Sequence, residues 1–175
     1  MPMKHRPVLE TDRLALRRLD ADLDAGFILR LLNEPSWLRY IGDRGVRTLE
    51  DARRYMLDGP IDMYDRLGFG LFLAELRESG LPIGLCGLIK RDGLADVDLG
   101  FALLPEHCSK GYAFESASAV LSWGRRVLNI PRIVAITSPD NNASVRLLQR
   151  LGFRYERRIR LSTTAPDLLL YHLAG

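Results

Sequence analysis

The chain is poor in the residues that build metal sites and disulfide frameworks. Among its 175 residues are two cysteines (Cys86 and Cys108) and three histidines (His5, His107 and His172). Two cysteines cannot supply a disulfide scaffold, and no histidine stands at a metal-ligand spacing from a cysteine or from another histidine. We therefore expect no metal cofactor, and the scarcity of cysteine favours a reducing compartment.

Long apolar runs are missing as well. No stretch approaches the roughly 20 apolar residues of a membrane-spanning helix, and the segment MPMKHRPVLETDRL lacks the apolar centre of a signal peptide. We expect a cytoplasmic protein without a membrane partner. Linkers, low-complexity tracts and fixed-period repeats are also absent, and a chain of this length can bury one ample core. A single domain over residues 1–175 is predicted.

Charge of one sign is not concentrated anywhere. The 25 Lys and Arg residues exceed the 22 Asp and Glu residues only slightly, for a net charge of +3. A protein that binds duplex nucleic acid usually gathers its basic residues on one face or helix. Here the densest basic group, FRYERRIR (153–160), alternates like a strand. We therefore expect no nucleic-acid partner.

Hydrophobic periodicity predicts a mixed α+β fold. Strands are expected at 13–19 (with one buried face), 69–77, 85–91, 94–104, 132–138, 155–161 and 168–173, and helices within 20–42, 48–59, 113–128 and 140–153. The three consecutive strands between 69 and 104 form an expected antiparallel meander. One mostly antiparallel sheet with helices on both faces follows from this order.

Start and stop signals bound most of the helices. Pro35 should end the first helix, Thr48 with Asp51 forms a capping box, and Gly59-Pro60 should stop the helix that this box begins. Asn141 can cap the helix near the C-terminus, and Gly152 suits the left-handed position after it.

One stretch, PEHCSKGYAFESA (105–117), joins an expected strand to an expected helix through Gly111. The first N–H groups of a helix have no intrahelical partners and, with the helix dipole, attract anions. A glycine lets a phosphate approach the backbone without a Cβ in the way, and Ser109 and Lys110 add a hydroxyl and a positive charge. Taken alone, the stretch fits an ordinary tight turn better than an anion site.

Other segments change that balance. Cys108-Ser109-Lys110-Gly111-Tyr112-Ala113 resembles the Q/R-x-x-G-x-G/A pyrophosphate loop of the GNAT superfamily of N-acetyltransferases. The segment NNASVRLLQRLGF (141–153) resembles its Asn-x-x-Ser and Leu-Gly-Phe pattern, and LETDRLALRRL (9–19) and TLEDARRYM (48–56) are similar to the RimJ/RimL-type branch. The resemblance covers nearly the whole chain in the expected order.

This resemblance implies a GNAT fold with splayed central strands and acetyl-CoA as cosubstrate. The backbone of Phe101, Leu103 and Leu104 would then bond pantetheine, and an amide near Ala102 would serve the thioester oxyanion. The amides of Ser109, Lys110, Gly111, Tyr112 and Ala113 would hold the pyrophosphate, and Asn141 would bond the pantetheine arm.

The implied reaction is direct attack of a primary amine on the thioester in a ternary complex. Deprotonation at pH 7 costs roughly 4.6 kcal/mol for a lysine-type amine but only about 1–1.4 kcal/mol for an α-amine. Asp98 is the candidate base, because it stands where many superfamily members carry Glu. Asp96, two residues earlier, would share its strand face and raise its pKa. Ser144 is the candidate acid for the thiolate, because Leu148 occupies the usual tyrosine position.

Two departures leave an alternative open. Cys108 replaces the usual Gln or Arg of the loop, so phosphate binding should depend on main-chain donors. With Leu148, this departure slightly favours a catalytically impaired GNAT-fold module that binds acyl-CoA or regulates, whereas the retained Gly111, Asn141 and Ser144 favour an active N-acetyltransferase. A Ser-His hydrolase is a weaker reading, since no G-x-S-x-G elbow is present. The acceptor is a protein N-terminus or a small amine, recognised by residues within 33–65, and dimers are frequent among such relatives.

Overall fold

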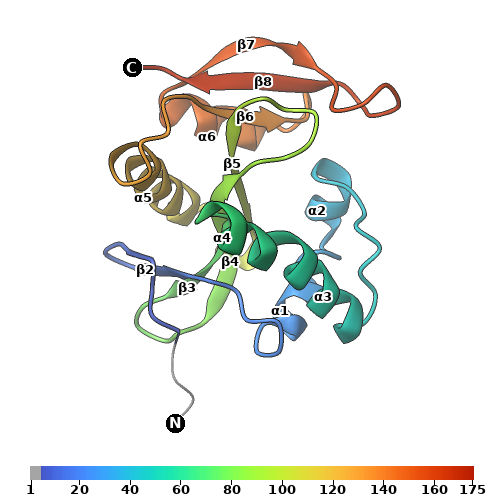
Figure 1. Cartoon of the computed structure of the whole chain (residues 1–175), viewed down its shortest axis with the longest axis vertical. Helices are drawn as coiled ribbons and strands as arrows, with labels where there is room; N and C mark the ends of the chain where they lie inside the picture. The colour runs from blue at the N-terminus through green and yellow to red at the C-terminus, as the bar shows by residue number, and fades with distance from the viewer. Residues whose placement is uncertain (1–4) are drawn as a thin grey trace.

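A single mixed sheet organises the protein. The computed structural model describes residues 5–175, and its strands lie in the order β1-β2-β3-β4-β5-β6-β8-β7 (Figure 1). Their bounds are β1 Leu9–Glu10, β2 Leu14–Arg17, β3 Leu71–Leu76, β4 Pro82–Ile89, β5 Val97–Leu103, β6 Ile133–Thr137, β7 Phe153–Ile159 and β8 Leu168–Leu173. Only the β5–β6 pair is parallel. The predicted α+β class and the antiparallel meander, now β3-β4-β5, are confirmed.

Helices cover both faces of the sheet. Their bounds are α1 Ala25–Leu31, α2 Pro35–Tyr40, α3 Leu49–Met56, a π-helical turn Leu57–Ile61, α4 Asp62–Leu67, a 3-10 turn Pro105–His107, α5 Tyr112–Arg126 and α6 Asn142–Arg150. Alternation along the central strands separates two cores. Phe72 and Cys86 face the core that contains α5 and α6, whereas Leu73 and Leu85 face α1, α2 and α3.

Helix ends agree with the sequence signals in three places. Thr48 and Asp51 form the predicted capping box, in which the Thr48 hydroxyl accepts from the Asp51 N–H at 3.0 Å. The Asn141 side chain caps α6 by accepting from the Ser144 N–H at 3.2 Å. Gly152 lies just past α6 with φ +94°, the left-handed conformation that glycine adopts without a Cβ penalty.

The prediction that Gly59-Pro60 stops a helix was wrong. The chain stays helical from Leu49 to Leu67 because the turn Leu57–Ile61 is π-helical. Proline has no N–H for an α-helical ladder, and the wider turn carries the chain past it without ending the helix. Gly68, at φ +79°, ends α4 instead. Pro35 ends nothing either, since it stands at the first turn of α2, where its missing N–H is not needed.

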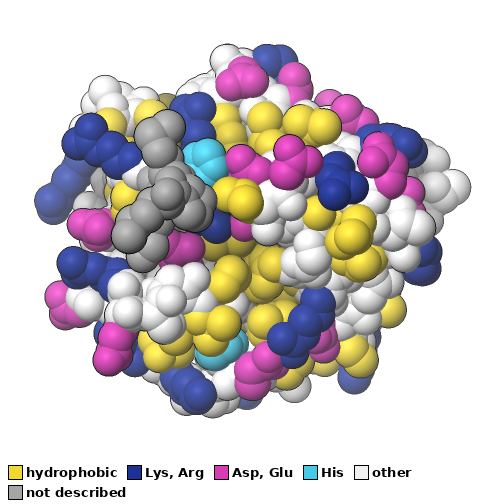
Figure 2. Space-filling view, turned by 90° about the horizontal axis from the view of Figure 1, so that it is seen from below, with side chains coloured by type: hydrophobic (Ala, Val, Ile, Leu, Met, Phe, Trp, Pro, Cys, Tyr) yellow, Lys and Arg dark blue, Asp and Glu magenta, His cyan; other side chains and the backbone are white. Residues whose placement is uncertain are grey.

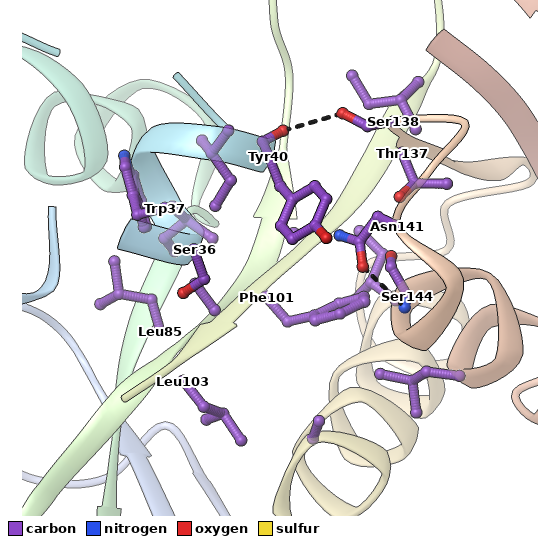
Figure 3. A pocket seen from close by; sticks show the side chains of 18 of the residues that line it. Ser36, Trp37, Tyr40, Leu85, Phe101, Leu103, Thr137, Ser138, Asn141 and Ser144 are labelled. Carbon is purple, nitrogen blue, oxygen red and sulfur yellow. Dashed lines mark hydrogen bonds between the residues drawn. The ribbon is translucent and has the colours of Figure 1, made fainter. Parts of the chain in front are cut away.

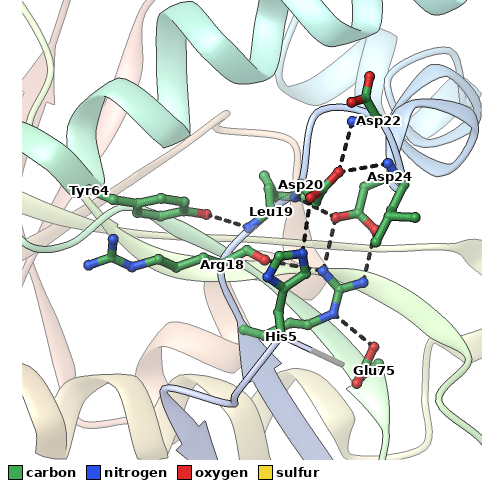
Figure 4. Close-up of polar contacts among 10 residues, drawn as sticks. His5, Arg18, Leu19, Asp20, Asp22, Asp24, Tyr64 and Glu75 are labelled. Atoms are coloured by element: carbon green, nitrogen blue, oxygen red, sulfur yellow. Dashed lines mark hydrogen bonds and ion pairs between the residues drawn. The ribbon is translucent and has the colours of Figure 1, made fainter. Parts of the chain in front are cut away.

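The expectation of one buried face for strand β2 was also wrong. All four of its residues are buried, and Arg17 is 9% exposed. Its guanidinium forms a two-bond ion pair with Asp24, at 2.9 Å for each bond, and bonds Glu75 at 3.1 Å (Figure 4). Hydrogen bonding to Asp24 raises the pKa of Arg17. The buried guanidinium of Arg17 thus has one carboxylate partner on β3 and one in the turn before α1. Its bonds to Asp24 in that turn fix where α1 starts.

The central strands separate, as the resemblance implies. Strand β5 pairs with β4 over its length, from Gly84↔Leu103 to Ile89↔Asp98. It pairs with β6 only at Val97↔Ile133 and Asp98↔Val134. Beyond Asp98 the two strands diverge, and β6 pairs with β8 on its other side. The outer edge of β5 from Leu99 onward is therefore not covered by a strand.

No helix between residues 5 and 175 is long and apolar enough to cross a membrane. Within the same residues no cluster of His, Cys, Asp or Glu could hold a metal ion. On the face shown in Figure 2, basic and acidic side chains are intermixed and form no field of one sign. That face offers no basic stripe of the kind that follows a nucleic-acid backbone.

Candidate active site

A pocket of about 1030 Å³ fills the gap between the diverging strands. One side is β5, and the others come from α2, from the start of α5 and from the end of β6 with α6 (Figure 3). Most predicted site residues line it, namely Asp98, Phe101, Ala102, Leu103, Ser109, Gly111, Tyr112, Ala113, Asn141 and Ser144. Lys110 and Leu104 do not, and Leu104 is buried in the core. The predicted residues that line the cavity lie up to 46 positions apart in the sequence, from Asp98 to Ser144.

The loop before α5 has an unusual backbone. Ser109 has φ +62° and Gly111 has φ +84°, and Gly111 is the residue that caps α5. In the described chain, nothing accepts a hydrogen bond from the N–H groups of Tyr112, Ala113 and Phe114. Left-handed residues beside a helix start turn successive N–H groups toward one point, which makes an anion-binding concavity. The loop fits a pyrophosphate without any side-chain donor.

Arg13 holds this loop in place. Its NH1 donates to the Lys110 carbonyl oxygen at 2.9 Å, and its Nε donates to Glu115 Oε2 at 2.7 Å. The guanidinium also lies over the Tyr112 ring, 4.4 Å from the centroid. A Cβ added at Gly111 would lie 3.1 Å from Arg13 NH2. Arg13 thus connects β2 to the start of α5, a long-range contact that the sequence pattern did not reveal.

The basic side chains around the loop differ in whether they line the pocket. Lys110 is exposed and does not line the pocket, so its predicted assistance to phosphate binding has no support in this arrangement. Arg146 and Arg150, one turn apart on α6, do line it, and Arg150 lies 4.7 Å from the Phe114 ring centroid. Besides Arg13, which is bonded to the loop itself, positive charge near the loop therefore comes from α6.

Cys108 also lines the pocket, where its thiol contacts the Leu104 carbonyl at 3.6 Å. Burial raises the pKa of the Cys108 thiol, so it stays neutral near pH 7.

Three hydroxyl or amide side chains meet where α6 begins. The Asn141 Oδ1 is occupied by the Ser144 N–H, which leaves the amide NH₂ of Asn141 available. No partner within residues 5–175 bonds the Ser144 hydroxyl. The ring of Tyr40, on α2, points toward Asn141 across the pocket (Figure 3). Leu148 is 1% exposed and belongs to the core, which confirms that it cannot serve as a proton donor.

Two contacts connect α2 to the loop before α6 across the cavity. The Ser138 hydroxyl donates to the Tyr40 carbonyl oxygen at 3.3 Å, and Arg39 forms an ion pair with Asp140 at 3.1 Å. They hold Tyr40 beside Asn141, so the position of its phenol depends on contacts at the C-terminal end of α2.

The surroundings of Asp98 differ from the sequence expectation in two ways. Asp98 is fully buried, and both oxygens accept bonds from Arg91, each at 3.0 Å. Asp96 lies outside β5 and is paired with Arg132 at 2.9 Å, so it does not form a carboxylate pair with Asp98. Burial, not a neighbouring carboxylate, raises the pKa of Asp98, and Arg91 opposes that effect.

Two central strands that separate, a helix start with unpaired N–H groups and a pocket that joins them define an acyl-CoA-dependent transferase. The acetyltransferase (GNAT) domain model matches residues 13–154. The N-acetyltransferase YoaA of Bacillus subtilis is 33% identical over 156 residues, 88% of this chain and 86% of its own length. The protein therefore belongs to the GNAT acetyltransferase family, and the predicted recognition is confirmed.

Solved structures agree with this assignment. An acetyltransferase from Agrobacterium tumefaciens superposes with a TM-score of 0.80 at 27% identity, over 98% of this chain and 96% of its own. RimL, a ribosomal L7/L12 α-N-protein acetyltransferase solved with coenzyme A, superposes with a TM-score of 0.80 over 95% of this chain and 97% of its own. At 19% identity, RimL shows a shared fold. The prediction of an acetyl-CoA-dependent N-acetyltransferase is confirmed.

Proposed function

We propose that the protein transfers the acetyl group of acetyl-CoA to a primary amine by direct attack in a ternary complex. The observation that carries this proposal is the continuity of the site. The uncovered edge of β5, from Leu99 onward, leads to the unpaired N–H groups at the start of α5. A thioester with a long amide-containing arm and a diphosphate matches such a path, because backbone groups can bond both parts.

In this proposal different residues bind different parts of acetyl-CoA. Phe101, Ala102 and Leu103 offer backbone groups along β5, and an amide near Ala102 stabilises the oxyanion of the attacked thioester. The loop Ser109–Ala113 holds the diphosphate through main-chain N–H groups. The Asn141 amide NH₂ bonds the arm from the opposite side.

The leaving thiolate needs a proton or a strong hydrogen bond. The residue predicted for this role is Ser144, whose hydroxyl lines the pocket with no partner in the described chain. A second hydroxyl, that of Tyr40, lies on the facing wall. A phenol (pKa about 10) gives its proton to a thiolate (pKa of the thiol about 8.5) at a cost of roughly 2 kcal/mol. A serine hydroxyl is a far weaker acid, so Tyr40 suits complete proton transfer better and Ser144 suits hydrogen bonding.

Asp98 as general base stays a prediction, because its carboxylate is already paired with Arg91. Each of its oxygens already accepts one bond from Arg91, so Asp98 must use a second lone pair and accepts a proton at the cost of weakening this ion pair. Until then the pair orients Arg91 at the pocket wall. An α-amine needs little help with deprotonation, about 1–1.4 kcal/mol at pH 7, and tolerates a site without a free base.

Measurement of CoA binding by calorimetry and of thiol release from acetyl-CoA with a panel of amines tests the proposal, with mass spectrometry of the acetylated products. Binding together with amine-dependent thiol release is expected. Binding without thiol release from any amine would contradict direct transfer. The cytoplasmic location, the single unit over residues 1–175 and a homodimer stay predictions.

A further inference from the structure

At the acceptor end of the pocket, the acidic side chains are paired and one basic side chain is not. It lies beyond Asp98, between the segment from α2 to α4 and the loop between β7 and β8, and apolar residues make most of its wall. These include Tyr55, Met63, Leu71, Ile89, Ala165 and Pro166. A polycationic acceptor needs carboxylates here, and an anionic one needs guanidinium or ammonium groups. The charged side chains of this wall therefore bear directly on the class of acceptor.

Every carboxylate that lines the pocket is already neutralised. Asp98 is held by two bonds from Arg91, and Glu34 is paired with Arg30 at 3.3 Å. A cationic substrate would have to share either carboxylate with its arginine. An amine acceptor with several positive charges would therefore meet no unpaired acid on the wall, and would face the positive charge of the arginines as well.

Arg44 is the opposite case. It lines the pocket from the segment between α2 and α3, and no carboxylate among residues 5–175 lies within ion-pair distance of it. Its neighbour Asp43 is paired with Arg47 at 2.6 Å. The exposed Arg44 guanidinium thus faces the cavity with its donors free to bond an anion.

Tyr55, on α3, adds a neutral donor at the same place. Arg44, Tyr55 and Arg91 line the same pocket. Burial raises the pKa of Tyr55, while the positive charges of Arg44 and Arg91 oppose that effect. The Tyr55 hydroxyl therefore keeps its proton near neutral pH. A guanidinium and a phenol from separate elements, with Arg91 close by, form the arrangement that binds a carboxylate or a phosphate.

We propose that the acceptor is a small amine that also carries an anionic group, such as an α-amino acid, and that Arg44 and Tyr55 bind this group. The inference rests on the proposed acetyl transfer and adds its substrate class. The contacts of Ser138 with Tyr40 and of Arg39 with Asp140 bridge the cavity, which favours a small acceptor over a folded protein's N-terminal segment.

The test compares amines that differ only in the anionic group. Phenylalanine, phenylalaninamide and phenethylamine share a ring and an amine, and spermidine and an acidic tripeptide extend the panel. A carboxylate raises the pKa of the neighbouring amine, so deprotonation alone favours the amide. We expect a kcat/KM at least about tenfold higher for phenylalanine, in spite of that bias.

Variants assign the preference to Arg44. Arg44→Gln should lower kcat/KM for phenylalanine about 10–100-fold, the value of a lost charged hydrogen bond, and leave phenylalaninamide within about threefold. Arg44→Glu should invert the order toward spermidine. Arg54→Gln is the matched control, since Arg54 is an exposed arginine of α3 that does not line the pocket. CoA affinity should be unchanged in all three.

The outcomes separate this inference from the proposed function. Equal turnover of the acid and the amide, an equal effect of Arg44→Gln on both, or a preference for spermidine or the tripeptide would each overturn the inference and leave acetyl transfer standing. If no amine gave thiol release from acetyl-CoA, the proposed function would be contradicted but this inference would not. In that case, binding of N-acetylphenylalanine and its amide to the CoA-loaded protein decides. At least about tenfold tighter binding of the acid, lost in Arg44→Gln, supports the inference, and equal binding overturns it.

Discussion

Substitution of Gly111 by alanine is the sharpest test of the CoA loop, because the chain supplies its own control. Gly111 and Gly152 both have positive φ, +84° and +94°. Either substitution places a Cβ in a left-handed backbone, at a cost of roughly 1–2 kcal/mol. For a domain of this size the melting temperature should fall by about 2–8 °C in each variant. The two glycines are therefore matched in backbone strain.

They differ in what the new methyl group meets. At Gly111 it would lie 3.1 Å from Arg13 NH2, at the pocket wall and beside the free N–H groups of α5. At Gly152 its closest neighbour is Leu173 Cδ1, at 3.8 Å, away from the pocket. Loss of even one charged hydrogen bond to a phosphate is worth about 1.5–3 kcal/mol, or more than tenfold in affinity.

Calorimetry with CoA measures this difference. Gly111→Ala should weaken CoA binding at least about tenfold, a bulkier Gly111→Val should abolish it, and Gly152→Ala should leave it within about twofold. Equal CoA affinity of Gly111→Ala and the wild-type protein would refute the assignment of the loop to the diphosphate. Equal loss in both alanine variants would show that backbone strain alone explains the effect.

Five further substitutions test the remaining residues. Cys108→Ala should change CoA affinity less than about twofold, because the neutral thiol contacts only a carbonyl oxygen; a large loss would show that the side chain takes part. Tyr40→Phe should lower kcat about tenfold or more, most for acceptors whose chemistry is slow, and Ser144→Ala by less; the reverse order would make Ser144 the main hydroxyl. Arg13→Gln should destabilise the fold by no more than about 1 kcal/mol, since its ion pair is half exposed, but should raise the Kd for CoA several-fold; calorimetry and thermal melts separate the two effects. Asp98→Asn should reduce kcat/KM and remove an acidic limb from its pH profile if Asp98 is the base, whereas an unchanged profile shape with a lower rate would assign it the role of positioning Arg91. The raised pKa of Asp98 means that the folded state holds its proton more tightly than the unfolded chain. The wild type should therefore lose stability relative to Asp98→Asn as the pH rises from about 3.8, which denaturant titrations at several pH values can measure.

Local signals predicted the backbone features of the proposed CoA loop and of the cap of α6. Gly111 and the helix after it, and Asn141 with Ser144, lie within short segments whose backbone geometry depends on neighbours in the chain. A positive φ, a helix start and a cap need only a few residues, so a motif can encode them. Where the prediction failed locally, at Pro60, a π-helical turn replaced the expected helix end, a rarer choice that no simple stop signal distinguishes.

Long-range contacts could not be predicted from such local sequence signals. Arg13 bonds Lys110 and Glu115 from about 100 positions away, and no periodicity relates these residues. The environment of Asp98 depends on Arg91 across the β4–β5 turn, which converts an expected free base into a buried ion pair. A residue type at a position indicates what chemistry is available, but its partner decides the protonation state and the access of substrate.

The same difference between local signals and long-range contacts explains why the acceptor is harder to predict from the sequence than the cosubstrate. In the proposed site the CoA half depends mainly on backbone groups, so Cys108 can stand where the family pattern has Gln or Arg. The proposed acceptor half depends on side chains such as Arg44 and Tyr55, which come from segments with no motif of their own. A family that keeps one backbone geometry for CoA can vary those side chains without disturbing the sheet. The unpaired Arg44 is therefore more informative about the acceptor than any resemblance of the whole fold.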